Sequence, residues 1–130
     1  NFIFEIPLDS QNKKEYKPGL HIISEFNSLY PEFLKDVNLI KTAFEDLLIR
    51  HHLTKLGEVY YQFPESGYTA VVCLTESHIS IHTWPEYNKV TFDVFLSNYE
   101  KYNNDIAEII HQTVLDVLKA KNVHTTKLER

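Results

Sequence analysis

The 130-residue sequence has little cysteine, little glycine and no long hydrophobic segment. Its single cysteine, Cys73, cannot form an internal disulfide, which fits a reducing compartment, and we expect a cytoplasmic protein. The three glycines do not form the glycine-rich loop that binds the phosphates of nucleotide cofactors. No apolar run approaches the roughly 18 residues that a transmembrane helix needs, and the first residues lack the pattern of a secretory signal. We therefore expect no membrane association.

A basic excess is also absent, since the formal net charge is -5. Proteins that bind nucleic acid normally carry clustered lysine and arginine, so we expect no nucleic-acid partner. The lysines near the C-terminus, with Arg130, are interpreted as a solvated tail. The length fits one domain. Residues 1–18 are interpreted as a polar N-terminal extension that ends at Pro18-Gly19, and residues 19–130 as the single domain.

Hydrophobic periodicity predicts two helices and several strands. One helix begins at Pro31, where proline is tolerated, and continues to about residue 52; the other spans about residues 102–120. The predicted strands span residues 20–26, 59–63, 68–75, 78–83 and 90–96. Short links between neighbouring strands favour an antiparallel sheet, and two amphipathic helices can cover only one of its faces. The sequence therefore predicts an α+β fold, a two-layer sandwich with an antiparallel sheet covered on one face by two helices.

The segment with the most chemistry combines a hydroxyl, two imidazoles and two carboxylates between apolar strands. Within it, Ser77 could attack the carbonyl carbon of Glu76 and exchange the amide for an ester. Elimination of that ester and hydrolysis of the product would leave a pyruvoyl group at position 77, on a chain that begins there. The segment reads Glu76-Ser77-His78-Ile79-Ser80-Ile81-His82-Thr83-Trp84-Pro85-Glu86-Tyr87.

Self-cleavage also needs a base, and His82 is the candidate. An imidazole with a reference pKa of about 6.5 is substantially neutral at pH 7 and can accept a proton. In an extended strand Ser77 and His82 point to opposite faces, so a turn or bulge would have to bring them together. For an isolated serine and histidine in a β-rich segment, a purely structural role is the commoner explanation.

Metal binding is the other chemistry to weigh for this segment, because His78 and His82 share one face of the strand. On a helix, two histidines four residues apart would suit zinc. On a strand, four residues span about 13 Å, which is too far for one ion. We therefore expect no metal site here.

The segment 76–87 resembles the self-cleavage segment of the prokaryotic S-adenosylmethionine decarboxylases, and the likeness extends over about residues 19–97. Supporting stretches are residues 19–23, 63–69 and 93–95. The resemblance implies a proenzyme that makes its pyruvoyl cofactor from Ser77 and decarboxylates S-adenosylmethionine to the aminopropyl donor for spermidine synthesis. It also implies a two-layer α+β sandwich that forms a homodimer, or a higher homo-oligomer, with active sites at the subunit interface.

The same resemblance assigns three substrate-binding residues. Phe63 corresponds to the aromatic ring that stacks on the adenine, and Glu86 to the carboxylate that accepts hydrogen bonds from the ribose hydroxyls. Thr69 stands where the family has an active-site serine and keeps a hydroxyl. It also implies that His82 is the processing histidine. Without the motif, Phe63 would be interpreted as a core residue and Glu86 as a surface acid.

Ser97 departs from the family pattern. The family ends this strand in Thr-Cys-Gly, whose cysteine donates the proton after carbon dioxide leaves, whereas this chain has Leu96-Ser97-Asn98. A hydroxyl is a much weaker acid than a thiol. Cys73, interpreted as a small core residue, is not expected to substitute. Three alternatives stay open: a decarboxylase of S-adenosylmethionine in which Ser97 or water supplies the proton, a pyruvoyl decarboxylase of arginine or ornithine, and an unprocessed, non-catalytic homologue.

Overall fold

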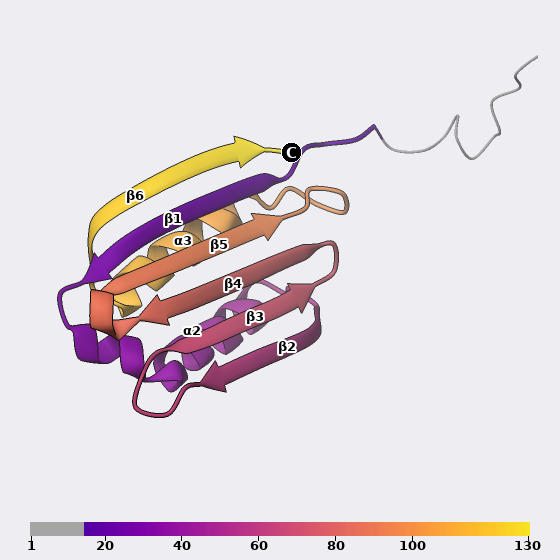
Figure 1. Cartoon of the computed structure of the whole chain (residues 1–130). Coiled ribbons are helices and arrows are strands. Elements are labelled where there is room, and N and C mark those ends of the chain that lie inside the picture. The colour runs from indigo at the N-terminus through magenta and orange to yellow at the C-terminus, as the bar shows by residue number, and fades with distance from the viewer. Residues whose placement is uncertain (1–14) are drawn as a thin grey trace, which may run out of the picture.

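The computed structural model describes residues 15–130 and has a six-stranded antiparallel sheet with two α-helices packed on one face (Figure 1). This confirms the predicted α+β sandwich. In chain order the elements are β1 (Leu20–Ser28), the 3-10 helix η1 (Pro31–Lys35), α2 (Val37–Arg50), β2 (Lys55–Gln62), β3 (Tyr68–Leu74), β4 (Ser77–Trp84), the 3-10 helix η2 (Pro85–Tyr87), β5 (Lys89–Leu96), α3 (Asn104–Val117) and β6 (Ala120–Glu129).

The strands lie in the order β2-β3-β4-β5-β1-β6, and every neighbouring pair is antiparallel. The helix α2 connects β1 to the far edge strand β2, and α3 connects β5 to the other edge strand, β6. Both helices lie behind the sheet in Figure 1. The near face of the sheet is therefore not covered by a helix of the described chain, and we call it the open face.

The core lies between the sheet and the helices, and alternation along the strands builds it. In β5 every second residue is fully buried, from Val90 to Leu96, as the sequence pattern predicts. These side chains meet the buried stripe of α2, which includes Ile40 and Phe44. The residues between the buried ones point to the open face, so the sheet presents half of its side chains there.

The single helix predicted from Pro31 to residue 52 is wrong in its first part. A 3-10 turn ends at Lys35, and Asp36 has an extended backbone with φ of -121°. The Asp36 carboxylate accepts a hydrogen bond of 3.0 Å from the backbone N–H of Asn38 and so caps a separate helix. The apolar spacing is similar on both sides of this break, which explains why periodicity alone did not reveal it.

The solvated C-terminal tail is also a wrong prediction, because residues 120–129 form the edge strand β6. It pairs with β1 in a register that sets Leu20 opposite Glu129, and Gly19 and Arg130 exchange two backbone hydrogen bonds of 2.9 and 3.0 Å. Nine of its ten residues are exposed. An edge strand with so little burial carries no hydrophobic alternation, so the sequence gives no signal for it.

The predicted N-terminal extension falls mostly on residues 1–14, which lie outside the described residues, and its boundary at residue 18 stays a prediction. Residues 15–18 have no regular secondary structure. Neither α2 nor α3 nor any other helix within residues 15–130 has the length and apolar character of a membrane-spanning segment.

Gly67 is required by close packing, and its replacement gives a first testable prediction. A Cβ at this position would lie 2.2 Å from the backbone oxygen of Thr83. The backbone at Thr83 would have to move to make room for this Cβ. Gly67→Ala is therefore expected to lower the free energy of unfolding by about 1–3 kcal/mol. Gly57→Ala is the matched control, since a Cβ there meets no atom within 4 Å. Urea denaturation measures both, and equal stability of the two variants would contradict the packing.

Candidate active site

Ser77 begins β4 directly after a tight hairpin turn. It pairs with Leu74 of β3, so Thr75 and Glu76 alone form the connection. Glu76 has φ of 57°, in the left-handed region that costs a residue with a Cβ roughly 1–2 kcal/mol. The peptide bond between Glu76 and Ser77 therefore follows a strained residue in a short turn.

The hydroxyl of Ser77 contacts the end of β5. Its Oγ accepts a hydrogen bond of 2.9 Å from the backbone N–H of Ser97, and Ser97 Oγ accepts one of 3.1 Å from the N–H of Tyr99. Ser77 and Ser97 line one cavity of about 170 Å³, together with Glu76, Tyr99 and other residues. Two of the predicted catalytic residues are thus brought together, although they are 20 positions apart in the sequence.

Asn98 holds the loop beyond Ser97 in place, a role that the sequence interpretation missed. Its buried side chain donates to the backbone oxygen of Pro18 and to Asn104 Oδ1, both at 2.8 Å, and accepts from the N–H of Asn103 at 2.6 Å. Its backbone is not among the left-handed residues. A side chain with this many partners fixes the loop beyond Ser97.

His82 lies on the open face, opposite Thr69 of β3. The Thr69 hydroxyl and His82 Nδ1 form a hydrogen bond of 2.8 Å, and the ring packs at 6.2 Å from that of Trp84. No hydrogen bond to His82 Nε2 is formed within residues 15–130. The threonine therefore orients the imidazole. In the tautomer in which Nδ1–H donates to Thr69 Oγ1, Nε2 can accept a proton.

The predicted substrate-binding residues lie at the same end of the sheet as His82. Phe63 directly follows β2, beside the Tyr61–Thr69 pair, and Glu86 lies in η2 directly after β4. Phe63 is 45% exposed and Glu86 is exposed, so the interpretation of Phe63 as a core residue does not apply. One end of the sheet thus carries Phe63, Thr69, His82 and Glu86.

Ser77 and His82 are far apart in one chain. They occupy opposite ends of β4, and the register of β4 with β3 and with β5 runs without a bulge. Five residues of extended strand span about 17 Å. The turn or bulge that would bring His82 to Ser77 is not formed, so a single copy of the chain separates the predicted nucleophile from the predicted base.

The interpretation of Cys73 as a core residue is wrong. It is exposed, because Thr69, Val71 and Cys73 are the residues of β3 that face the open side. The continuous apolar run of β3 hid this alternation, since the outward residues Val71 and Cys73 are apolar like the buried ones. Cys73 pairs with His78, next to Ser77, and not with the His82 end of the sheet.

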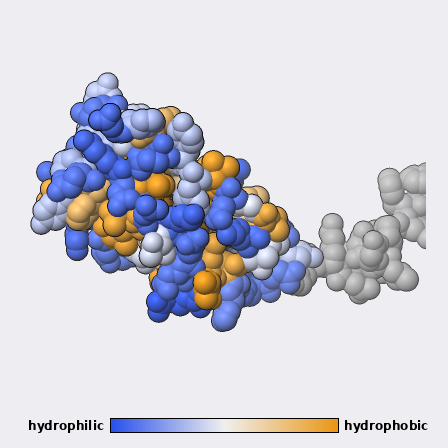
Figure 2. All heavy atoms as spheres, turned by 90° about the horizontal axis from the view of Figure 1, so that it is seen from below, coloured by the Kyte–Doolittle hydropathy of each residue, from blue (hydrophilic) through white to orange (hydrophobic). Residues whose placement is uncertain are grey.

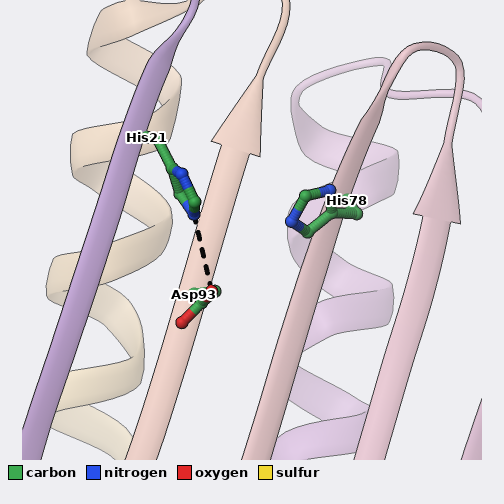
Figure 3. A group of neighbouring side chains, drawn as sticks. All are labelled: His21, His78 and Asp93. Atoms are coloured by element: carbon green, nitrogen blue, oxygen red, sulfur yellow. Dashed lines mark ion pairs between the residues drawn. The ribbon is translucent and has the colours of Figure 1, made fainter. Parts of the chain in front are cut away.

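A second polar group on the open face was missed by sequence reasoning. His21 of β1, His78 of β4 and Asp93 of β5 converge there (Figure 3), with ligand-type atoms all within 4.8 Å of one another. His21 Nε2 lies 3.5 Å from Asp93 Oδ2. Burial, and then the neighbouring His21, lowers the pKa of His78. The three residues come from separate parts of the sequence, so no local spacing could indicate them.

Comparison with known proteins gives one family. The model of the S-adenosylmethionine decarboxylase family matches residues 20–130. The chain is 35% identical over 112 residues to the S-adenosylmethionine decarboxylase proenzyme of Picrophilus torridus, covering 86% of this chain and 83% of the relative. The corresponding proenzyme of Archaeoglobus fulgidus is 42% identical over 77 residues, which cover 59% of this chain and 69% of the relative.

A solved structure agrees with these sequence matches. The crystal structure of the adenosylmethionine decarboxylase from Aquifex aeolicus VF5 superimposes with a TM-score of 0.76 at 31% identity, covering 89% of this chain and 92% of that chain. The family match spans the whole sheet and both helices. This chain belongs to the S-adenosylmethionine decarboxylase family.

Proposed function

We propose that this chain is the proenzyme of a pyruvoyl-dependent S-adenosylmethionine decarboxylase that cleaves itself between Glu76 and Ser77. The observation that carries the proposal is the position of Ser77, directly after a strained turn residue and with its hydroxyl held by the N–H of Ser97. Family membership supports the same conclusion, because the matched relatives are named as proenzymes of this decarboxylase.

In the proposed cleavage, Ser77 Oγ attacks the carbonyl carbon of Glu76, and the nitrogen of Ser77 leaves as a free amine, so an ester replaces the amide. A base then removes the Cα proton of Ser77. The Cβ–O bond breaks, and its electron pair leaves with the new carboxylate of Glu76. The remaining dehydroalanine takes up water and releases ammonia, which leaves a keto group at position 77. The products are residues 1–76 and residues 77–130.

Position 77 suits a small planar keto group. It borders the 170 Å³ cavity, and the N–H of Ser97 already donates to the oxygen carried by this residue. A pyruvoyl group supplies an electron-withdrawing carbonyl for decarboxylation of a bound α-amino acid. Ser97, which lines the same cavity, is the side chain proposed to deliver a proton, directly or through water. Its hydroxyl is a weak acid, so we expect slow turnover.

Substrate recognition is proposed for the other end of the sheet. The exposed ring of Phe63 offers a flat face to an adenine or to a sulfonium cation. The exposed carboxylate of Glu86 can accept hydrogen bonds from ribose hydroxyls. At the same end of the sheet, the Thr69 hydroxyl and His82 Nδ1 form a hydrogen bond that orients the imidazole.

We propose that a second copy of the chain joins the two ends into one site. In a face-to-face dimer, the open faces of two copies pack against each other. A two-fold axis that runs between the two sheets, across the strands, then places the Ser77 end of one copy against the His82 end of the other. Each of two equivalent sites then contains Ser77 and Ser97 from one protomer and Phe63, Thr69, His82 and Glu86 from its partner. This arrangement removes the separation of about 17 Å along one strand. Because Ser77 has the opposite parity to His78 and His82 in β4, its side chain must also turn toward the partner.

The open face has the surface that such packing requires. Six large hydrophobic side chains on it are 37–61% exposed, and a lone monomer rarely leaves so many uncovered. They are Ile23, Val59, Tyr61, Val71, Trp84 and Leu128. Seen from below, on the side where β2 lies, hydrophobic residues instead form separate patches among hydrophilic ones (Figure 2). The open face is therefore the better candidate for packing against a second sheet.

The product of this reaction would be the aminopropyl donor for spermidine synthesis, and the proposed location is the cytoplasm. The single, exposed thiol of Cys73 is in keeping with a reducing compartment. Arginine and ornithine remain the alternative substrates, since Ser97 replaces the cysteine of the family.

A carbon dioxide release assay with S-adenosylmethionine, arginine and ornithine in parallel tests the substrate. We expect release from S-adenosylmethionine alone. Ser97→Cys restores a stronger acid at the cavity and is expected to raise this activity by about tenfold or more. Ser97→Thr is the control, because it changes the same side chain without adding a stronger acid. Turnover of only a basic amino acid would contradict the assigned substrate, and an unchanged rate in Ser97→Cys would contradict proton delivery at position 97.

A further inference from the structure

Three side chains from three neighbouring strands meet on the open face, close to the Ser77 end but outside the proposed catalytic set. His21 and His78 both pair with Phe95, from opposite sides of β5, and their ring centroids are 5.9 Å apart. Asp93 lies two residues before Phe95 on the same face. Figure 3 shows the two imidazoles turned toward the space beside this carboxylate.

His21 is buried without a hydrogen-bond partner. Its side chain is 8% exposed, and neither Nδ1 nor Nε2 forms a hydrogen bond within the described residues. The 3.5 Å separation from Asp93 exceeds the 2.7–3.2 Å of an ordinary hydrogen bond. A buried polar atom without a partner costs about 1–3 kcal/mol, and such groups in native proteins usually satisfy a ligand, a water or an ion. Both ring nitrogens of His21 can therefore bind a further atom.

The donor set identifies the class of that atom. Two imidazole nitrogens and one carboxylate oxygen suit a borderline divalent transition metal such as zinc or cobalt, and not the oxygen-seeking magnesium or calcium. All three ligand-type atoms already lie within 4.8 Å of one another. A tetrahedral ion with bonds of about 2.0–2.2 Å needs them about 3.4 Å apart, so side-chain rotations of roughly an ångström close the site.

We propose that His21, His78 and Asp93 bind one divalent transition-metal ion on the open face, with a fourth position left for water. The ion would link β1, β4 and β5 at the end of the sheet that carries Ser77. The histidine pair His78 and His82, four residues apart on one strand, is not the site; His78 instead meets ligands from other strands. The proposal does not depend on self-cleavage or on decarboxylation.

Two nearby charges act on this site. The Asp93 carboxylate attracts a cation, while the guanidinium of Arg130, 5.9 Å from the Phe95 ring, repels one.

The test is titration of the tag-free, full-length chain with cobalt(II) and zinc(II), followed by metal content after gel filtration. We expect one ion per chain, visible cobalt absorption bands that zinc abolishes, and a rise in melting temperature with zinc. Asp93→Asn and His78→Ala are each expected to weaken binding by about tenfold or more. His124→Ala is the matched control, a histidine on the same face of the edge strand β6, and is expected to bind as the unsubstituted chain does.

Two results would overturn the proposal. One is the absence of stoichiometric cobalt or zinc from the unsubstituted chain. The other is binding that Asp93→Asn and His78→Ala leave unchanged while circular dichroism shows them folded. Asp93→Asn keeps the shape of the side chain, so it separates loss of a ligand from loss of the fold. Because metal content is measured without substrate, failure here leaves the decarboxylase proposal untouched, and an inactive enzyme leaves the metal proposal untouched.

Discussion

Ser77→Ala is expected to abolish self-cleavage completely and leave one chain of 130 residues. Without the hydroxyl, no atom at position 77 can take over the acyl group of Glu76, and no keto group can form there. Decarboxylation is lost with it. The fold should persist, because the substitution removes one hydrogen bond, that from the Ser97 N–H, which is worth about 1 kcal/mol. Denaturing gel electrophoresis and intact mass follow the chain over time.

Ser80→Ala is the matched control for this variant, since Ser80 lies on the same strand, three positions further on. It is expected to cleave like the unsubstituted chain. Fragments that persist in Ser77→Ala would show that the scissile bond is elsewhere. Fragments absent from both variants and from the unsubstituted chain would indicate that the protein is a non-catalytic homologue.

Mixed dimers of Ser77→Ala with His82→Ala are expected to recover a cleavage that neither variant has alone. His82→Ala by itself should process about 10²–10⁴ times more slowly, as loss of a general base predicts. In a mixed dimer, Ser77 of the His82→Ala chain faces the intact His82 of its partner. That chain should therefore be cut, while the Ser77→Ala chain stays whole. After selection for mixed dimers, every His82→Ala chain has such a partner and is expected to become cleavable.

The experiment needs two different affinity tags, co-expression, and purification over both tags before the masses are measured. If His82 served its own chain, a mixed dimer would cleave neither chain, because one lacks the nucleophile and the other the base. That outcome, or failure to isolate any mixed dimer, would contradict the shared site. The separation of about 17 Å along β4 makes cleavage of the His82→Ala chain the expected result.

Most of the fold could be predicted because its core follows simple periodicity. The alternation of β5 and the apolar stripes of α2 and α3 are patterns of burial, and burial is what hydrophobicity reports. The wrong predictions concern residues whose burial leaves no such pattern in the sequence. The strand β6 is exposed along nearly all its length, and Cys73 faces outward from a strand that is apolar on both sides. Neither leaves a periodic signal.

The candidate site was likewise predictable from the sequence only in part. The local motif predicted the residues of β4 and the turn before it, since their chemistry is contiguous in sequence. Their arrangement in space needed the structure: Ser97 meets Ser77 across strands, and Thr69 meets His82. His21 and Asp93 could not be linked to His78 at all, because their convergence depends on the strand order β4-β5-β1. Sequence spacing says nothing about neighbours that only topology creates.

Intact mass of the freshly purified, unsubstituted protein, before and after reaction with a hydrazide, tests the central claim most directly. The account predicts two polypeptides that end at Glu76 and begin at position 77, and only the second should gain the mass of the hydrazone. A single unbroken polypeptide with an unmodified serine at position 77, and no carbonyl for the reagent to trap, would contradict it.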